Sequence, residues 1–531
     1  MVRKSLFLLL VVATAVSVAQ TGAHYLVFSD DQYLSDIEPL VEWRRATGLR
    51  TEVVPLSTVG YDTAAVHDYV LAAVAEWDIK PEFILLVAHP ATLRAKIHGH
   101  GPDMVYSDNY FGDVEGDFRG EIPVGRFPCR TRFQCRVMVA KALSYERTPE
   151  TTDAVWMRRL TTVVREDYDP DDNIYWGDVR YAASLAGARG FAECDSLSRA
   201  RQDNIDSVIG SLNTGTGLVM YRGRATENWY YPFNVNPANA ENGTRLPLVL
   251  SITCATMALD PYDSMVGRAW VFTGTPDVPK GAVAFFGSTH SDVNVAAKRS
   301  ALARGVFTSL FTDDRNVVGD MLLGAKEYLH AQYPGDLCKE DYRGFNLFGD
   351  PALRLWTGEP RVLDVEHPDE LRPGPSQVVV TVRHQGQPVP GAFVCASMDS
   401  SVHAVDTTDA QGRVEMSISP PEGTLRLVVT GTNIYPYEAS IPVVITGVAE
   451  LPGLLRPSGL EITPNPARDH VLLSITGADR PVPVQFFDAT GRMVGTLAMN
   501  GEETRVSIRG LRPGVYLARV GTITRRLVVS D

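Results

Sequence analysis

A cysteine at the end of an apolar run is the most reactive side chain in a chemically suggestive position. Cys254 closes the run 248–253, which is typical of a buried strand. A thiol attacks a carbonyl carbon once a base has taken its proton, and imidazole is the usual base. His290 follows a second apolar run, 282–289, and is a candidate base or a polar loop residue. Cys254 itself is either a nucleophile or a packed strand-end thiol, as most buried cysteines are.

Two charged residues occupy similar positions after apolar runs. Glu166 follows residues 160–165, and Arg224 lies just beyond residues 217–221. A guanidinium stays protonated in any accessible environment, so Arg224 cannot take a proton from a thiol. As a fixed positive neighbour it would still favour the thiolate form of Cys254. Taken by itself, Glu166 is a solvated carboxylate at the end of a predicted strand.

The apolar runs alternate with amphipathic stretches as far as residue 356. This alternation predicts a mainly parallel sheet covered by helices, in which loops at the carboxyl ends of neighbouring strands line one crevice. Helices are predicted at stretches such as 37–47 and 64–77. Strands are predicted at residues 25–29, 51–55, 83–88, 160–165, 217–221, 248–253 and 282–287.

After residue 356 the helical periodicity ends and short alternating strands follow one another between turn residues. This pattern predicts two β-sandwich modules, at residues 360–447 and 460–531, joined by a linker at 448–459 that is rich in Pro, Gly and Leu. Strands are predicted at 377–383, 392–397, 414–418 and 425–430 in the first module, and at 471–475, 484–488, 505–508, 515–520 and 526–529 in the second.

Length and composition limit the number of domains and the classes of partner that are possible. A chain of 531 residues is too long for one core, so we expect several folded units. The net charge of −13, without a cluster of Lys and Arg, argues against nucleic acid or an anionic membrane as the main partner. The six cysteines show no zinc-type spacing, and Cys129 and Cys135 are close enough in sequence to pair if the geometry allows.

The first residues predict export. Arg3 and Lys4 precede a short apolar run, and small residues follow at 17–19, so residues 1–23 are predicted to be a signal peptide. The apolar run is too short for a transmembrane helix, and no later stretch approaches the length that a span requires.

The last module carries three motifs in order. They are Ile462-Thr-Pro-Asn-Pro-Ala-Arg468, Val484-Gln-Phe-Phe-Asp-Ala-Thr-Gly-Arg492 and Leu511-Arg-Pro-Gly-Val-Tyr-Leu-Ala-Arg519. Each contains an ordinary turn, which a plain adhesive sandwich would also have. As a set they resemble the C-terminal sorting domain of type IX secretion. The resemblance implies the type IX secretion machinery as a partner and a secreted or outer-membrane surface location.

The region 24–356 carries a set of motifs, which are Tyr25-Leu-Val-Phe-Ser29 with Trp43-Arg-Arg-Ala-Thr-Gly48, Tyr110-Phe-Gly-Asp113 leading to Glu121-Ile-Pro-Val-Gly-Arg126, and Asn346-Leu-Phe-Gly-Asp-Pro-Ala-Leu353. As a set they resemble the gingipain family of cysteine peptidases, and the resemblance implies two subdomains at about 24–150 and 151–356. The implied fold is a caspase/gingipain-like α/β domain whose mainly parallel sheet has two sub-sheets. The module at 360–447 is similar to the immunoglobulin-like sandwich that follows the peptidase domain in this family.

The same resemblance assigns roles to the residues described above. Cys254 matches the nucleophile, Glu166 matches by position an acidic residue near the catalytic histidine, and Arg224 stands where the family has that histidine. Ala225 also departs from the family pattern, in which Gly follows the histidine. Members of the family often bind calcium, so the acidic run 167–173 is a candidate calcium loop or a plain soluble loop.

Two functions follow, and they differ in whether Cys254 catalyses the cleavage of peptide bonds. One is a gingipain-like cysteine endopeptidase acting on protein or peptide substrates, with His290 as a possible substitute base. The other is a catalytically inactive pseudopeptidase that binds peptides or surface partners, because the residue at the position of the base is Arg224. A weaker third option is a structural or adhesive surface protein in which the crevice has no role.

Overall fold

The computed structural model describes two compact units, residues 1–445 and 446–531. Within them the described residues are 21–101, 104–191, 193–260, 265–293, 295–399, 401–445, 459–476, 482–489, 491–499, 503–520 and 523–530. The predicted signal peptide lies outside them except for its last three residues, and the predicted linker lies outside them except for Gly459. Among these residues, no helix combines the length and the hydropathy needed to cross a bilayer.

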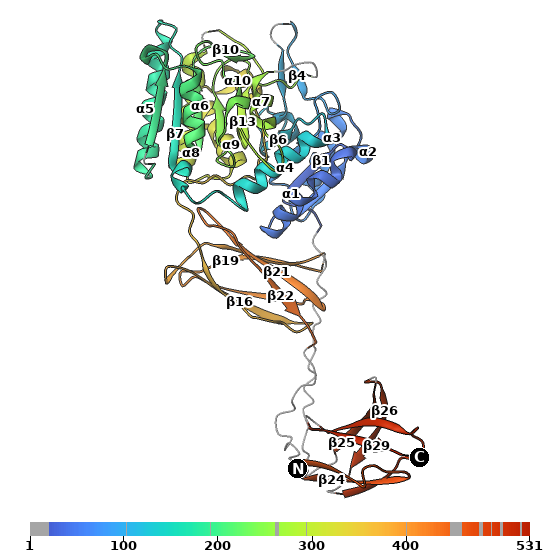
Figure 1. The fold of residues 1–531 in the computed structure, drawn as a ribbon. Helices are drawn as coiled ribbons and strands as arrows, with labels where there is room; N and C mark the ends of the chain where they lie inside the picture. Colours follow the sequence, from blue (N-terminus) through green and yellow to red (C-terminus); the bar gives the residue numbers. More distant parts are fainter. Residues whose placement is uncertain are drawn as a thin grey trace, which may run out of the picture. The chain divides into compact units, whose positions relative to one another are not determined.

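In the described part of the first unit, ten strands form one sheet made of two parallel blocks (Figure 1). The blocks run in opposite directions and meet at one antiparallel pair, β13 with β14. The first block contains, in order, β2 (Thr51–Pro55), β1 (Tyr25–Ser29), β3 (Phe83–Val87), β6 (Val124–Phe127) and β14 (Phe345–Phe348). The second contains β13 (Ala284–Ser288), β12 (Leu248–Ser251), β9 (Leu218–Arg222), β7 (Arg159–Val164) and β8 (Glu193–Ser198).

Helices cover both faces of this sheet, because its strands are apolar on both sides. On β1, Tyr25 and Val27 pack with α1, whereas Leu26 and Phe28 pack in a separate cluster with α3. Helix α8 packs against both α5 and α9. Helix bounds are α1 (Leu34–Ala46), α2 (Leu56–Val59), α3 (Thr63–Glu76), α4 (Arg132–Glu146), α5 (Asp171–Ala188), α6 (Ile205–Thr214), α7 (Val266–Phe272), α8 (Ala296–Phe311), α9 (Val318–Gln332) and α10 (Lys339–Gly344).

The same compact unit contains a β-sandwich of two four-stranded sheets with its own buried core. One sheet contains β15 (Asp364–Glu366), β16 (Ser376–His384), β17 (Gln387–Pro388) and β20 (Arg413–Ile418). The other contains β19 (Val402–Thr407), β18 (Phe393–Met398), β21 (Gly423–Thr430) and β22 (Tyr437–Val443). Val428 faces away from this core and packs on Trp43 and Ala46 of α1.

The second unit is also an antiparallel sandwich with a separate core. Its described strands are β23 (Gly459–Thr463), β24 (His470–Thr476) and β27 (Glu503–Ser507) in one sheet, and β26 (Met493–Met499), β25 (Val482–Asp488), β28 (Gly514–Val520) and β29 (Ile523–Val529) in the other. The predicted fold class, an α/β domain with a large mainly parallel sheet followed by all-β sandwiches, is therefore confirmed. Cys129 and Cys135, the candidate pair, are both buried and free.

Candidate functional site

The second block brings the four predicted site residues to one edge of the sheet. Its strands β13, β12, β9 and β7 are parallel neighbours, so their carboxyl ends lie together. His290, Cys254, Arg224 and Glu166 each follow one of these strands within three residues. Parallel strands place polar residues after their carboxyl ends in a shared crevice. The side chains at this edge, however, have different partners.

The sulfur of Cys254 is partly exposed and has two polar contacts. Nη1 of Arg299 donates a hydrogen bond to it over 3.1 Å, and the thiol faces the backbone oxygen of Asp292 at 3.6 Å. The first contact favours the thiolate, since the donor is charged. The second favours the protonated thiol, because a carbonyl oxygen accepts the S–H and repels an anion. The two contacts therefore act in opposite directions on the state of the sulfur.

Arg299 is a buried residue of α8 that its neighbours keep charged. Its side chain is 2% exposed, and its Nε lies 2.9 Å from Oδ1 of Asp341. The Nζ of Lys298 lies 3.2 Å from the other oxygen of Asp341, Oδ2. Burial alone would lower the pKa of Arg299, but the negative charge of Asp341 and the contact with Cys254 outweigh it, so the pKa is raised. The residue beside the sulfur is consequently a permanent cation whose charge Asp341 partly compensates.

Arg224, at the position where a base was expected, turns to a loop instead. Its side chain is 59% exposed, with Nε 3.1 Å from Asp167 and Nη2 2.9 Å from Asp169. Asp167 also pairs with Arg165, and Asp172 accepts the backbone N–H groups of Asp167 and Tyr168. Within the described residues no contact joins Arg224 to Cys254. The acidic run 167–173 thus pairs with arginines and closes its own turn, and calcium binding by this run stays a prediction.

Glu166 is fixed by partners of its own. It is 4% exposed, and Nε1 of Trp176 donates to one carboxylate oxygen at 3.1 Å. The backbone N–H of Ala200 donates to the other oxygen at 3.2 Å. Both oxygens therefore tie β7 to α5 and to the turn after β8, and neither contacts an imidazole.

His290 is buried beside two carboxylates rather than bonded to the sulfur. It is 5% exposed, and its Nε2 lies 3.9 Å from Oε2 of Glu340. Asp292, whose backbone faces Cys254, completes a group in which one ligand atom from each residue lies within 4.8 Å of the others. Among the described residues no hydrogen bond links the imidazole to Cys254. Its role as a substitute base stays a prediction.

Arg299, Asp341 and Glu340 were not identified from the sequence. They lie on α8 and α10, far along the chain from Cys254, and the folding of these helices onto the sheet brings them there. One signal was available: Arg299 lies in Ala296-Ala-Lys-Arg-Ser-Ala-Leu-Ala303, where small and apolar neighbours indicate a buried helix. A buried arginine requires a partner.

A cavity of about 690 Å³ lies elsewhere in the same unit, where α1 meets the first sandwich. Its lining includes Arg44 and Glu146 from the large domain, and Phe393 and His403 from the sandwich. None of the four predicted site residues lines it. The chemistry of Cys254 is therefore considered at the sheet edge and not in this cavity.

Known proteins resemble both parts of the chain. The model of peptidase family C25 matches residues 18–356, and that of the secretion system C-terminal sorting domain matches residues 461–530. Gingipain R2 of Porphyromonas gingivalis is 21% identical over 94% of the chain and 66% of its own length. Gingipain R1 of the same species is 20% identical over 79% of the chain and 41% of its own length. The chain thus spans less than two thirds of these relatives.

Solved structures agree in fold with the first unit. The crystal structure of the Arg-specific cysteine proteinase gingipain R aligns with a TM-score of 0.71 at 19% identity, covering 80% of the chain and 98% of that structure. A complex of gingipain pro- and mature domains from P. gingivalis aligns with a TM-score of 0.70 at 20% identity, over 79% of the chain and all of that structure. At this identity the likeness shows the fold.

Proposed function

The chain belongs to peptidase family C25, and from this premise we propose that it is a secreted or cell-surface protein whose C25 domain binds peptides or surface partners without hydrolysing them. One observation carries the proposal. The described polar neighbours of the Cys254 sulfur are the guanidinium of Arg299 and the carbonyl of Asp292, and neither can take a proton. The sorting domain would engage the type IX secretion machinery.

Hydrolysis of a peptide by a thiol needs two proton transfers. A base takes the thiol proton before attack, and an acid returns a proton to the leaving amine. Arg224 is directed to Asp167 and Asp169, and the carboxylate of Glu166 is held by Trp176 and Ala200. Arg224 and Glu166, which stand at the proposed positions of the base and the orienting acid, therefore bind other partners. The crevice keeps the thiol of Cys254 but lacks these two catalytic groups.

An active cysteine endopeptidase is the second candidate, and a specific observation favours it. Arg299 donates to Cys254, which stabilises a thiolate, and His290 lies two residues from Asp292, whose carbonyl faces the sulfur. In this alternative a rotation of His290 would bring the imidazole to Cys254 as base. The two candidates differ in one measurable outcome: the endopeptidase cleaves peptides through Cys254, and the binding protein does not.

The experiment compares thiol reactivity with turnover in the full chain. A thiol-directed covalent probe should label wild type but not Cys254→Ala, and Cys194→Ala, which removes another partly exposed thiol, should keep the label. Peptides containing Arg or Lys should bind without being cleaved. Cleavage that disappears in Cys254→Ala but persists in Cys194→Ala would establish the endopeptidase and reject the proposal.

A further inference from the structure

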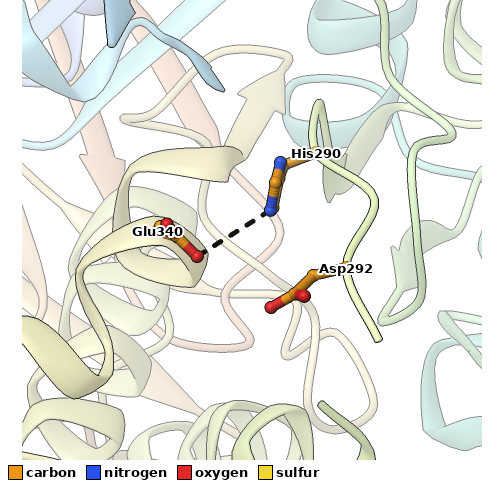
Figure 2. A group of neighbouring side chains, drawn as sticks. All are labelled: His290, Asp292 and Glu340. Carbon is orange, nitrogen blue, oxygen red and sulfur yellow. Dashed lines mark ion pairs between the residues drawn. The ribbon is translucent and has the colours of Figure 1, made fainter. Parts of the chain in front are cut away.

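Three side chains from two separate elements meet beside Cys254 and have no role in the proposed function. His290 and Asp292 lie between β13 and α8, and Glu340 lies in the first turn of α10 (Figure 2). One nitrogen or oxygen of each lies within 4.8 Å of those of the other two. We propose that these residues bind a zinc ion. The inference stands apart from the function proposed above, since zinc binding needs neither Cys254 nor turnover.

The imidazole of His290 provides the strongest observation. Its side chain is 6% exposed, yet its Nδ1 has no hydrogen-bond partner, and its Nε2 is 3.9 Å from Glu340, too far for a hydrogen bond. Buried polar groups are normally satisfied, because an unpaired one costs about 1–3 kcal/mol. Nε2 points into the space between the two carboxylates (Figure 2). A cation in that space would give Nε2 a partner, whereas Nδ1 points away from it and would stay unpaired among the described residues.

The surrounding charges suit a cation. Among the described residues no lysine or arginine pairs with Asp292 or Glu340. The nearby cations Lys298 and Arg299 pair with Asp341, at 3.2 and 2.9 Å, and Arg299 also donates to Cys254. The group therefore combines two uncompensated carboxylates with one imidazole, and a divalent ion would neutralise it.

The donor set favours zinc over calcium. Zinc takes imidazole nitrogen and carboxylate oxygen at about 2.0–2.2 Å and is usually four-coordinate, whereas calcium takes six to eight oxygen ligands. Three protein donors leave one position for water. The atoms must move closer than the 4.8 Å limit to reach one ion, and Glu340, whose side chain is 54% exposed, is free to do so.

Zinc at this position would act on the surroundings of Cys254 through the backbone. The carbonyl of Asp292 contacts the sulfur at 3.6 Å, and that of His290 lies 3.5 Å from Nη2 of Arg299. An ion shared with Glu340 would fasten this segment to α10. It would also hold His290 away from Cys254, which removes the candidate substitute base.

Titration calorimetry of the full chain with zinc chloride, after chelator dialysis, tests the site. We expect one zinc ion per chain in wild type, and affinity at least about tenfold weaker in Glu340→Gln and His290→Gln. Glu340→Gln alters an exposed side chain, so a folding defect is not expected. Asp336→Asn is the matched control, because Asp336 is an exposed carboxylate just before α10. It should bind as wild type does, as should Cys254→Ala.

X-ray absorption of the zinc-loaded protein identifies the ligands independently of activity. The proposal requires a first shell of nitrogen and oxygen alone. Sulfur in that shell, with binding lost in Cys254→Ala, would place the ion on the thiol and overturn the proposal. Unchanged affinity in both Glu340→Gln and His290→Gln would also overturn it, as would displacement of zinc by an equal concentration of calcium.

Discussion

Two arginines near the ends of β9 and β12 differ in what they contact. Arg224 was predicted to stand where the family has its base, but its guanidinium is exposed and pairs with Asp167 and Asp169. Arg299, from α8, is buried and donates to Cys254. A buried charged donor acts on its partner more strongly than an exposed one, since solvent screens the exposed charge. Arg299 is therefore the arginine that contacts the thiol, and Arg224 belongs to the loop.

Replacement of Arg224 by His should not restore a peptidase. A histidine there would lie beside Asp167 and Asp169, which would hold it as they hold Arg224. We expect Arg224→His to show turnover of Arg- or Lys-containing peptides no more than a few-fold above Cys254→Ala. Peptide cleavage assays measure it. A large gain of turnover would mean that the crevice lacks nothing except the imidazole.

Removal of Arg299 should slow the chemistry of Cys254. Without the N–H donor the thiolate loses a charge-assisted hydrogen bond, so alkylation by iodoacetamide should slow by several-fold to about tenfold in Arg299→Gln. Asp341 keeps Lys298 as a partner, which limits damage to the fold. Arg304→Gln on the same helix, which loses a pair with Asp178, is the control. Equal alkylation rates in wild type and Arg299→Gln would show that Arg299 has no influence on the thiol.

At the scale of elements, the sequence predicted what hydrophobic pattern alone determines. Strands β1, β2, β3, β7, β9, β12 and β13 were found to within about two residues. All of them except the edge strand β2, in which Glu52 is exposed, are buried on both faces. Strand β6 was missed since Arg126 interrupts it, and that arginine is fully buried in a pair with Asp108 at 2.6 Å. Strand β8 was missed because its sequence is mostly polar. The placement of the four predicted residues at one sheet edge was predictable, because each directly follows a strand. The approach of Arg299 and Glu340, which lie on helices, was not.

A buried lysine of α9, Lys326, should make the free energy of unfolding depend on pH. Lys326 donates to the carbonyl of Phe345 in β14 at 2.7 Å and to Asn109, and burial lowers its pKa to about 7. Unfolding restores the ordinary value of about 10.4, so the unfolded chain holds the extra proton between these limits. The contribution of Lys326 to the free energy of unfolding is therefore smallest below pH 7 and rises as the pH increases toward 10.

The matching variant is Lys326→Met, which keeps a long unbranched side chain and removes the titrating amine. Between pH 7 and pH 9, the free energy of unfolding of wild type should rise relative to the variant by on the order of 1–2 kcal/mol. Urea denaturation of both proteins at each pH measures this difference. A difference that stays constant across the interval would contradict the lowered pKa.

At the scale of the molecule, the first sandwich is part of the same compact unit as the C25 domain. Trp43 of α1 is 2% exposed and packs on Val428 of β21, and Arg147 pairs with Glu438 at 2.6 Å. Val428 lies between Leu427 and Val429, both of which face the core of the sandwich. Val428 thus packs on the C25 domain while the neighbouring side chains fill the core of the sandwich, which suits a module that covers and stabilises α1.

Truncation should distinguish the two sandwiches. A chain ending after Ile445 lacks a unit with its own core, so the thermal midpoint of the C25 domain should change by less than about 2 °C. A chain ending after Trp356 exposes Trp43, and burial of one large side chain contributes about 1.5–3 kcal/mol, so its midpoint should fall by roughly 5 °C or more.

Val428→Asp in the full chain should lower the midpoint in the same direction, because it places a carboxylate against Trp43 and leaves the sandwich core intact. Calorimetry measures all three, and an unchanged midpoint after truncation at Trp356 would show that the C25 domain does not depend on its neighbour.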